Sequence, residues 1–254
     1  MKVGFFDSGV GGLTVLRAFQ KLCPDVETEY LADTKHCPYG NRPPEEIVRF
    51  SVANTEELLR RGCDVIVVAC NTATAAAIDY LRANYPEIPF VGMEPALKPA
   101  AIQSKSGVVG VLATAGTFNG RLYNETKARF AKDVVVLAVV ADEFVELVER
   151  GETSGAKVEA VVRSKVEPLL KAGADRIVLG CTHFPHLRPV IEAVCAGRAE
   201  VVDSSAPVAR RIRFILKELG GSKELGGFAA KSRELSEVAT KSRSGLKELR
   251  SKEG

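Results

Sequence analysis

Short apolar runs rich in β-branched residues alternate along this chain with longer stretches in which apolar residues recur at helical spacing. We predict eight strands, at residues 2–7, 27–32, 65–69, 90–92, 107–113, 134–140, 176–180 and 200–203. Helical patterns lie between most of them, at 13–21, 45–61, 73–84, 118–130, 156–172, 185–193 and 208–219. This alternation is typical of βαβ units, and it predicts an α/β fold in which helices cover both faces of parallel sheets.

Two pairs of similar segments indicate an internal repeat. Residues 3–9 (VGFFDSG) resemble residues 109–116 (VGVLATAG) at an offset of 106, and residues 62–72 (GCDVIVVACNT) resemble residues 173–183 (GADRIVLGCTH) at an offset of 111. We therefore expect two pseudo-symmetric parallel-sheet domains with a ligand site in the cleft between them. Pro95 and Pro99 mark the boundary, and the helix from Val208 is expected to return to the first half. The predicted domains are 1–96 plus 207–254, and 97–206.

Each copy of the second repeat places a cysteine where a buried strand ends, as Cys70 and as Cys181. A helix is predicted to begin after Cys70, and its dipole is expected to lower the thiol pKa. His183 supplies the commonest partner for activating a thiol beside Cys181. A lone buried cysteine is usually structural, which is the interpretation we give to Cys23, Cys37, Cys63 and Cys195. Two thiols in duplicated positions favour acid/base chemistry on opposite faces of one substrate. A cysteine hydrolase would leave the second thiol unexplained.

The turn after the first strand, at residues 7–12 (DSGVGG), is rich in glycine and precedes a helix. Its backbone N–H groups would suit an anion. The glycine spacing differs from that of dinucleotide-binding and P-loop motifs, so a small carboxylate is the better ligand. Asp7 has an alternative role as a tight-turn residue. The turn Pro38-Tyr39-Gly40 either covers a ligand or is a plain loop. His36 and His186 are expected to be ordinary surface or core residues.

The composition argues against several other classes of protein. The chain has 254 residues, of which 46% are hydrophobic, enough for a sizeable core, and its net charge of +3 gives no argument for nucleic acid. No apolar run approaches the ~20 residues that cross a bilayer, and the first apolar run ends at Asp7, unlike a signal peptide. We therefore predict a cytoplasmic protein without membrane contact. Its six cysteines would be thiols, and no Cys-x-x-Cys or His-x-x-x-His spacing suggests a metal site.

The ordered set of motifs resembles bacterial glutamate racemases over about residues 2–219. The matching segments are 7–12 (DSGVGG), 38–40 (PYG), 70–72 (CNT), 91–95 (VGMEP), 110–117 (GVLATAGT), 144–151 (FVELVERG), 181–183 (CTH) and 202–205 (VDSS). The resemblance implies a cofactor-independent enzyme, without a metal, that interconverts L- and D-glutamate and supplies D-glutamate for peptidoglycan synthesis. It also implies a homodimer.

The resemblance further implies a role for each site residue. Cys70 and Cys181 would be the two acid/base groups, assisted by Asp7 and by His183 respectively, and Glu149 would lie near the second cysteine. The residues that would hold the amino acid's polar groups are Ser8, Tyr39, Gly40, Asn71, Thr72, Thr114, Thr117 and Thr182. Aspartate and hydantoin racemases share the logic of two thiols and differ in the side-chain pocket.

The C-terminal segment departs from that family. Residues 226–230 (GGFAA) lack the Thr-rich strand with which family members often end, and residues 223–254 carry 8 Lys or Arg against 5 Asp or Glu. We expect a docked terminal helix there. The chain begins directly at its first strand, so regulation through an N-terminal extension that senses a cell-wall precursor is not expected. A non-catalytic protein on the same scaffold, whose Lys-rich tail binds a partner such as DNA gyrase, is the second class of function; a solvated helix explains the tail charge equally well.

Overall fold

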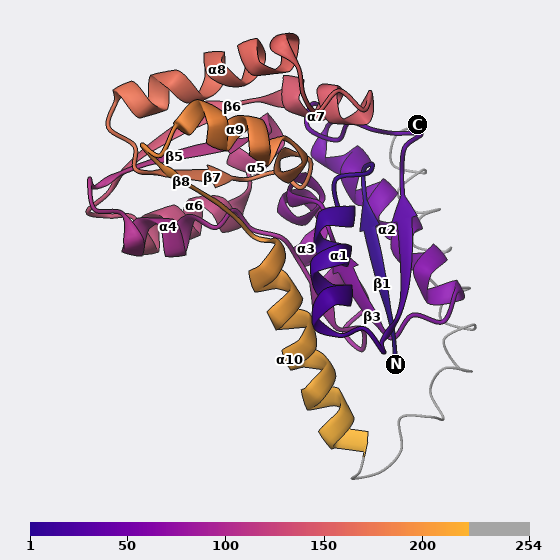
Figure 1. Cartoon of the computed structure of the whole chain (residues 1–254). Coiled ribbons are helices and arrows are strands. Elements are labelled where there is room, and N and C mark those ends of the chain that lie inside the picture. Colours follow the sequence, from indigo (N-terminus) through magenta and orange to yellow (C-terminus); the bar gives the residue numbers. More distant parts are fainter. Residues whose placement is uncertain (224–254) are drawn as a thin grey trace, which may run out of the picture.

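The computed structural model describes residues 1–223, which form two four-stranded parallel sheets (Figure 1). The first sheet has the order β2-β1-β3-β4, with β1 (Lys2–Asp7), β2 (Glu27–Ala32), β3 (Val65–Val68) and β4 (Phe90–Val91). The second has the order β6-β5-β7-β8, with β5 (Val108–Ala113), β6 (Val135–Val140), β7 (Arg176–Leu179) and β8 (Glu200–Asp203). The two orders are equivalent, which confirms the predicted pair of similar α/β units. Every predicted strand is present within one residue of its expected bounds.

Helices cover both faces of each sheet. Around the first sheet, α1 (Leu13–Leu22) and α10 (Ser205–Lys223) lie on one face, and α2 (Pro44–Arg60) and α3 (Asn71–Asn84) on the other. Around the second, α7 (Asp142–Glu149), α8 (Ala156–Lys171) and α9 (Arg188–Cys195) cover one face, and α4 (Leu97–Gln103) and α6 (Arg121–Phe130) the other. The strands are therefore apolar on both sides, which explains their continuous hydrophobic runs. Of the helices within residues 1–223, none combines the length and apolar character that crossing a bilayer requires.

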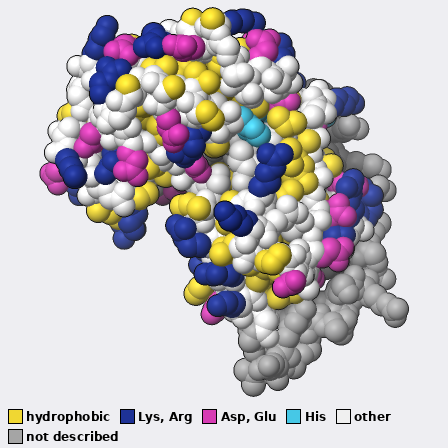
Figure 2. Space-filling view, in the orientation of Figure 1, with side chains coloured by type: hydrophobic (Ala, Val, Ile, Leu, Met, Phe, Trp, Pro, Cys, Tyr) yellow, Lys and Arg dark blue, Asp and Glu magenta, His cyan; other side chains and the backbone are white. Residues whose placement is uncertain are grey.

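Helix α10 follows the second sheet but packs on the first half, alongside α1 (Figure 1). Its residues Ile212 and Leu216 belong to the same buried cluster as Phe19 of α1. Figure 2 shows Lys and Arg side chains gathered over α10, where Arg210, Arg211, Arg213 and Lys217 are exposed. The chain thus returns as expected, although the assignment of 1–96 with 207–254 and of 97–206 stays a prediction. The predicted terminal helix lies outside the described residues.

Three helices escaped the sequence prediction: α4, α5 (Ala115–Phe118) and α7. Pro99 was interpreted as punctuation, yet it occupies the first turn of α4, where proline is tolerated. The pattern predicted at 118–130 corresponds to α6, which begins at Arg121, and the one at 185–193 begins as a 3₁₀ turn, η1 (Phe184–Leu187). Helix α7 had a visible signal, because acidic residues open it and Gly151, at φ 74°, follows it.

The cysteine repeat has a shared structural basis in its first three residues. Gly62 and Gly173 follow α2 and α8 with φ of 78° and 88°, a left-handed conformation that favours glycine. Two residues after Gly62, Asp64 Oδ2 accepts the backbone N–H of Lys2 at 2.7 Å. At the corresponding position Asp175 accepts the N–H groups of Lys105 (2.6 Å) and Ser106 (3.0 Å). Both acids tie the start of a cysteine strand to the chain entering the neighbouring strand.

We expect Asp175→Ala to lower the free energy of unfolding by about 1–3 kcal/mol, because it removes a charged acceptor that several donors of the loop before β5 share. The Ser104 hydroxyl also donates to this carboxylate at 2.7 Å. Urea unfolding followed by circular dichroism measures the change. The exposed Asp133 provides the matched control, and Asp133→Ala should stay within about 0.5 kcal/mol of the wild type. Equal effects of the two substitutions would contradict this role of Asp175.

Candidate active site

Cys70 and Cys181 follow the central strands β3 and β7, and they line one cavity between the two halves. In each sheet the strand order reverses direction between the first and third strands, which is where parallel α/β sheets bind ligands. The cavity measures about 10 Å³, room for about one water molecule. Its lining consists of Ser8, Pro38, Tyr39, Gly40, Cys70, Thr72, Thr114, Val145, Cys181 and His183. The duplicated thiols thus line the same small cavity.

Cys70 caps the N-terminus of α3, and its Sγ accepts the backbone N–H of Ala73 at 3.4 Å. The expected lowering of its pKa is nevertheless wrong. Burial, followed by the nearby carboxyl of Asp7, raises the pKa of Cys70 well above its ordinary value, and the Ala73 N–H only opposes that shift. The thiol is 5% exposed and donates to Ser8 Oγ at 3.9 Å. In the closed site, Cys70 is therefore a protonated acid.

Asp7 ends β1 and is completely buried beside Cys70. Its carboxylate accepts the backbone N–H groups of Ser8 (2.8 Å) and Gly12 (2.6 Å) and the hydroxyl of Thr182 (3.3 Å). Burial raises the pKa of Asp7, opposed by the charge of His183 and by the Gly12 N–H. The Ser8 hydroxyl lies 3.5 Å from Asp7 Oδ1, so it stands between this carboxyl and the Cys70 thiol.

Cys181 has a different partner. Its Sγ lies 3.7 Å from Nδ1 of His183, whose Nε2 lies 2.5 Å from Glu149 Oε1. Burial alone would lower the pKa of His183, but Cys181, Cys37 and Glu149 outweigh it and hold the pKa well above the ordinary value. The hydrogen bond from His183 in turn lowers the pKa of Glu149, against its burial. An imidazolium therefore stands beside the Cys181 sulfur, held by a carboxylate on its far side.

The glycine-rich turn differs from its predicted role as an anion site. Its N–H groups already donate to protein carboxylates: those of Ser8 and Gly12 to Asp7, and that of Val10 to Glu149 Oε1 at 2.9 Å. The glycines permit close approach of the second half instead. A Cβ on Gly9 would lie 1.9 Å from Glu149 Oε1, and one on Gly11 would lie 2.5 Å from His183 Nδ1. This turn is one of the surfaces on which the two halves meet.

Most of the residues predicted to bind the amino acid line one of two neighbouring cavities. Hydroxyl groups of Thr72, Thr114 and Thr117 form a chain across the halves, with Oγ1 separations of 2.8 and 3.0 Å. Tyr39 is buried beside the cavity, and its hydroxyl donates to Asp33 Oδ2 at 2.5 Å. Ser8, Gly40, Thr72 and Thr114 line the cysteine cavity. Thr182 is not part of this lining, and its hydroxyl donates to Asp7 Oδ2.

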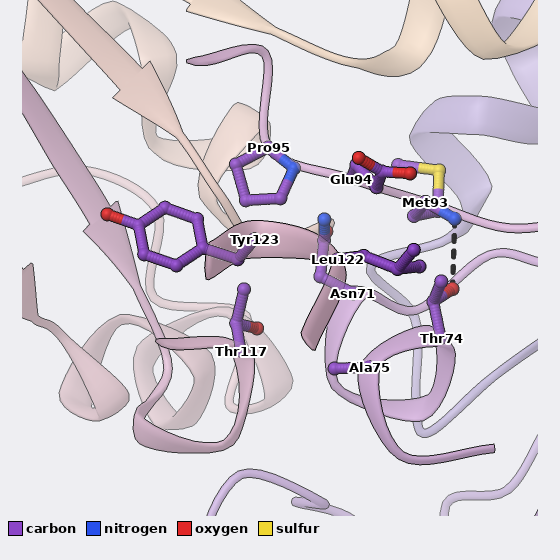
Figure 3. Close-up of a pocket in the computed structure, with 9 residues that line it drawn as sticks. All are labelled: Asn71, Thr74, Ala75, Met93, Glu94, Pro95, Thr117, Leu122 and Tyr123. Atoms are coloured by element: carbon purple, nitrogen blue, oxygen red, sulfur yellow. Dashed lines mark hydrogen bonds between the residues drawn. The ribbon is translucent and has the colours of Figure 1, made fainter. Parts of the chain in front are cut away.

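Asn71 and Thr117 line a neighbouring cavity of about 10 Å³ (Figure 3). Figure 3 shows the Asn71 amide pointing into the space between Leu122 and Tyr123, beside Pro95. The Asn71 Nδ2 and the Tyr123 hydroxyl are buried without a hydrogen-bond partner. This space is polar on one side and takes its lining from both halves.

Sequence reasoning missed three residues of the site. Val145 on α7 lines the cysteine cavity, Asp33 holds Tyr39, and Cys37 lies with Glu149 and His183 in a group of possible metal ligands. The position of Cys37 directly before Pro38-Tyr39-Gly40 was the available signal. Of the predicted residues, Ser8, Tyr39, Gly40, Thr72, Thr114 and His183 line the cavity with the two thiols, whereas Asn71 and Thr117 line the neighbouring one.

Comparisons with known proteins place this chain in a family of racemases. The family model for Asp/Glu/hydantoin racemase matches residues 13–212. A glutamate racemase of Herpetosiphon aurantiacus is 50% identical over 214 residues, which are 84% of each chain. The Escherichia coli glutamate racemase, solved with L-glutamate and the activator UDP-MurNAc-Ala, is similar at a TM-score of 0.79 and 36% identity, over 85% of this chain and 82% of that one. A Pyrococcus horikoshii aspartate racemase homologue reaches a TM-score of 0.50 at 19% identity, over 84% of this chain and 98% of that one, and shares the fold.

We expect Gly9→Ala to hold the two halves apart, because the added Cβ would overlap Glu149 Oε1. Overpacking costs about 1–3 kcal/mol, so the open form should become roughly 5- to 150-fold more populated. Mass spectrometry can follow iodoacetamide labelling of Cys181, which is 8% exposed in the closed form. Gly220→Ala is the control, because a Cβ there would meet only Met1 Cε, at 4.0 Å. Unchanged labelling of Cys181 in Gly9→Ala would contradict the tight contact.

Proposed function

This chain belongs to the Asp/Glu/hydantoin racemase family, and on that premise we propose that it interconverts L- and D-glutamate through Cys70 and Cys181. The observation that carries the proposal is the single cavity that both thiols line, each beside its own ionisable partner. Relatives named glutamate racemase at 50% and 46% identity favour glutamate as the substrate. The likeness to an aspartate racemase homologue supports only the shared fold.

The proposed reaction needs one thiolate and one thiol at the same time. The thiolate removes the α-proton, and the electron pair of the C–H bond moves into the α-carboxylate. The opposite thiol then delivers its proton to the other face of Cα, so that the two sulfurs exchange protonation states. A single acid/base group typically contributes ~10²–10⁴-fold. Donors placed at the substrate carboxylate must supply much of the remaining stabilisation.

We propose that the two sulfurs regain their starting protonation states through different groups. His183 is protonated beside Cys181 and can return a proton to that sulfur through Nδ1, while Glu149 stabilises its charge at Nε2. Asp7 has a raised pKa and can hold a proton for Cys70, with the Ser8 hydroxyl between them. The charge of Cys181 is among the lesser causes that raise the pKa of Cys70.

Substrate entry requires the halves to separate. Glutamate has ten heavy atoms, whereas the closed cavity of about 10 Å³ has room for about one water molecule. We propose that the halves close on the bound amino acid, and that closure brings the two thiols to opposite faces of Cα. The hydroxyls of Ser8, Thr72, Thr114 and Thr182, with Tyr39 and Gly40, would hold its polar groups. Asn71 and Thr117 would act from the neighbouring cavity.

The proposal also covers the cofactor requirement, the cellular compartment, the oligomeric state and the use of the product. The route uses only side-chain acids and bases and therefore needs no cofactor or metal. We propose that it operates in the cytoplasm, in a homodimer, and that its D-glutamate serves peptidoglycan synthesis. The family membership and the identity to glutamate racemases support this setting.

Incubation with L-glutamate in D₂O is expected to give α-deuterated D- and L-glutamate and to abolish optical rotation. The deuterium enters because the thiol that reprotonates Cα exchanges with solvent. Proton NMR of the α-position and polarimetry measure both changes, and L-aspartate serves as the comparison substrate. Retained rotation and α-protium with glutamate, or faster exchange with aspartate, would contradict the proposed substrate.

Cys70→Ala and Cys181→Ala are each expected to lower racemisation by at least ~10²-fold, because each removes one of two required acid/base groups. Elimination needs only one base. Each variant should therefore still convert one enantiomer of 3-chloroglutamate to 2-oxoglutarate, and the two variants should prefer opposite enantiomers. Cys63→Ala, at a buried cysteine outside the cavity lining, is the matched control. The same enantiomer preference in both variants would rule out bases on opposite faces.

A further inference from the structure

Three side chains from distant parts of the sequence meet at the edge of the site. Cys37 lies between β2 and α2, Glu149 ends α7, and His183 follows Cys181. One donor atom from each, a thiol sulfur, a carboxylate oxygen and a ring nitrogen, all lie within 4.8 Å of one another. The pairwise spacing between Glu149 Oε1 and His183 Nε2 is 2.5 Å. Within residues 1–223, this is the group of Cys, His, Asp and Glu side chains close enough to share a metal ion.

The donor types select the class of metal. Thiolate, imidazole and carboxylate together suit Zn²⁺, which binds them at about 2.0–2.3 Å in tetrahedral geometry with water as a fourth ligand. Donors on one such ion lie about 3–4 Å apart, so the group needs to rearrange by only about 1 Å. His183 is buried, whereas Cys37 and Glu149 are partly exposed, which leaves the ion a path from solvent.

The position of the ligands decides what the ion would do. Cys37 belongs to the first half, whereas Glu149 and His183 belong to the second. An ion held by all three would therefore tie the two halves together. The cavity of about 10 Å³ is closed in this arrangement, and glutamate cannot enter it without their separation.

We propose that Cys37, Glu149 and His183 form a Zn²⁺ site that locks the cleft shut and inhibits the protein reversibly. Binding displaces two protons to solvent, that of the Cys37 thiol and that on Nε2 of the His183 imidazolium, and the ion takes the resulting thiolate, the freed Nε2 lone pair and a carboxylate oxygen of Glu149. Zinc and glutamate then compete, because the ion stabilises the closed form and the substrate needs the open one. The metal site itself stands apart from the proposed function, and only its inhibitory effect rests on racemisation.

Co²⁺ titration of the full chain tests the site without any activity measurement. Co²⁺ bound to a thiolate gives a sulfur-to-metal charge-transfer band in the near ultraviolet, and we expect one equivalent per chain, displaced by Zn²⁺. Cys37→Ser should remove the band and weaken Zn²⁺ binding by at least about 100-fold, because even partners outside the coordination shell contribute ~10–100-fold. Cys70→Ala and Cys181→Ala should keep the band.

A band that survives in Cys37→Ser and disappears in Cys70→Ala or Cys181→Ala would overturn the proposal, since the metal would then bind the cavity thiols. Absence of a band in the wild type would overturn it as well.

In activity assays, Zn²⁺ should raise the apparent KM for glutamate with little effect on kcat, and EDTA should reverse this inhibition. Inhibition of Cys37→Ser, normalised to its own activity without zinc, should need at least about 100-fold more zinc. A protein that binds Co²⁺ through Cys37 but does not racemise glutamate would contradict the proposed function alone.

Discussion

One carboxylate oxygen joins the two halves of this molecule. Glu149 Oε1 lies 2.5 Å from His183 Nε2 in its own half and accepts the N–H of Val10 from the glycine-rich turn of the other half at 2.9 Å. This contact requires glycine at positions 9 and 11, because side chains there would overlap Glu149 and His183. It also orients the imidazole whose other nitrogen faces Cys181. Closure of the cleft and preparation of the second thiol therefore depend on the same atom.

The two thiols have different electrostatic surroundings in the closed site. Burial and the Asp7 carboxyl favour the protonated form of Cys70, whereas an imidazolium stands beside Cys181. A racemase with two bases needs one protonated and one deprotonated group at the start of each turnover. The two nearly equivalent folds surround their thiols differently, because the residues after the cysteines differ: Asn71-Thr72 in one copy and Thr182-His183 in the other.

Much of the fold could be predicted because β-branched runs and the cysteine repeat are local signals. The strands β3 and β7 were predicted correctly, together with the glycine, the acid and the cysteine that each repeat contains. Gly62 and Gly173 both adopt a left-handed conformation, which explains why each repeat begins with glycine. Properties that arise from contacts between distant segments were missed. The pKa of Cys70 was predicted in the wrong direction, since burial between two halves outweighs a helix N-terminus. Cys37 was interpreted as structural because its neighbours Glu149 and His183 are more than a hundred residues away.

Racemisation by this protein requires two sulfurs to approach one stereocentre from opposite sides, which a crystal structure of the protein with bound glutamate can test. We expect that structure to show Cys70 Sγ and Cys181 Sγ in contact with Cα on opposite faces, with the threonine hydroxyls on the substrate's polar groups. Both sulfurs on the same face of Cα, or either one turned away from the bound amino acid, would contradict it.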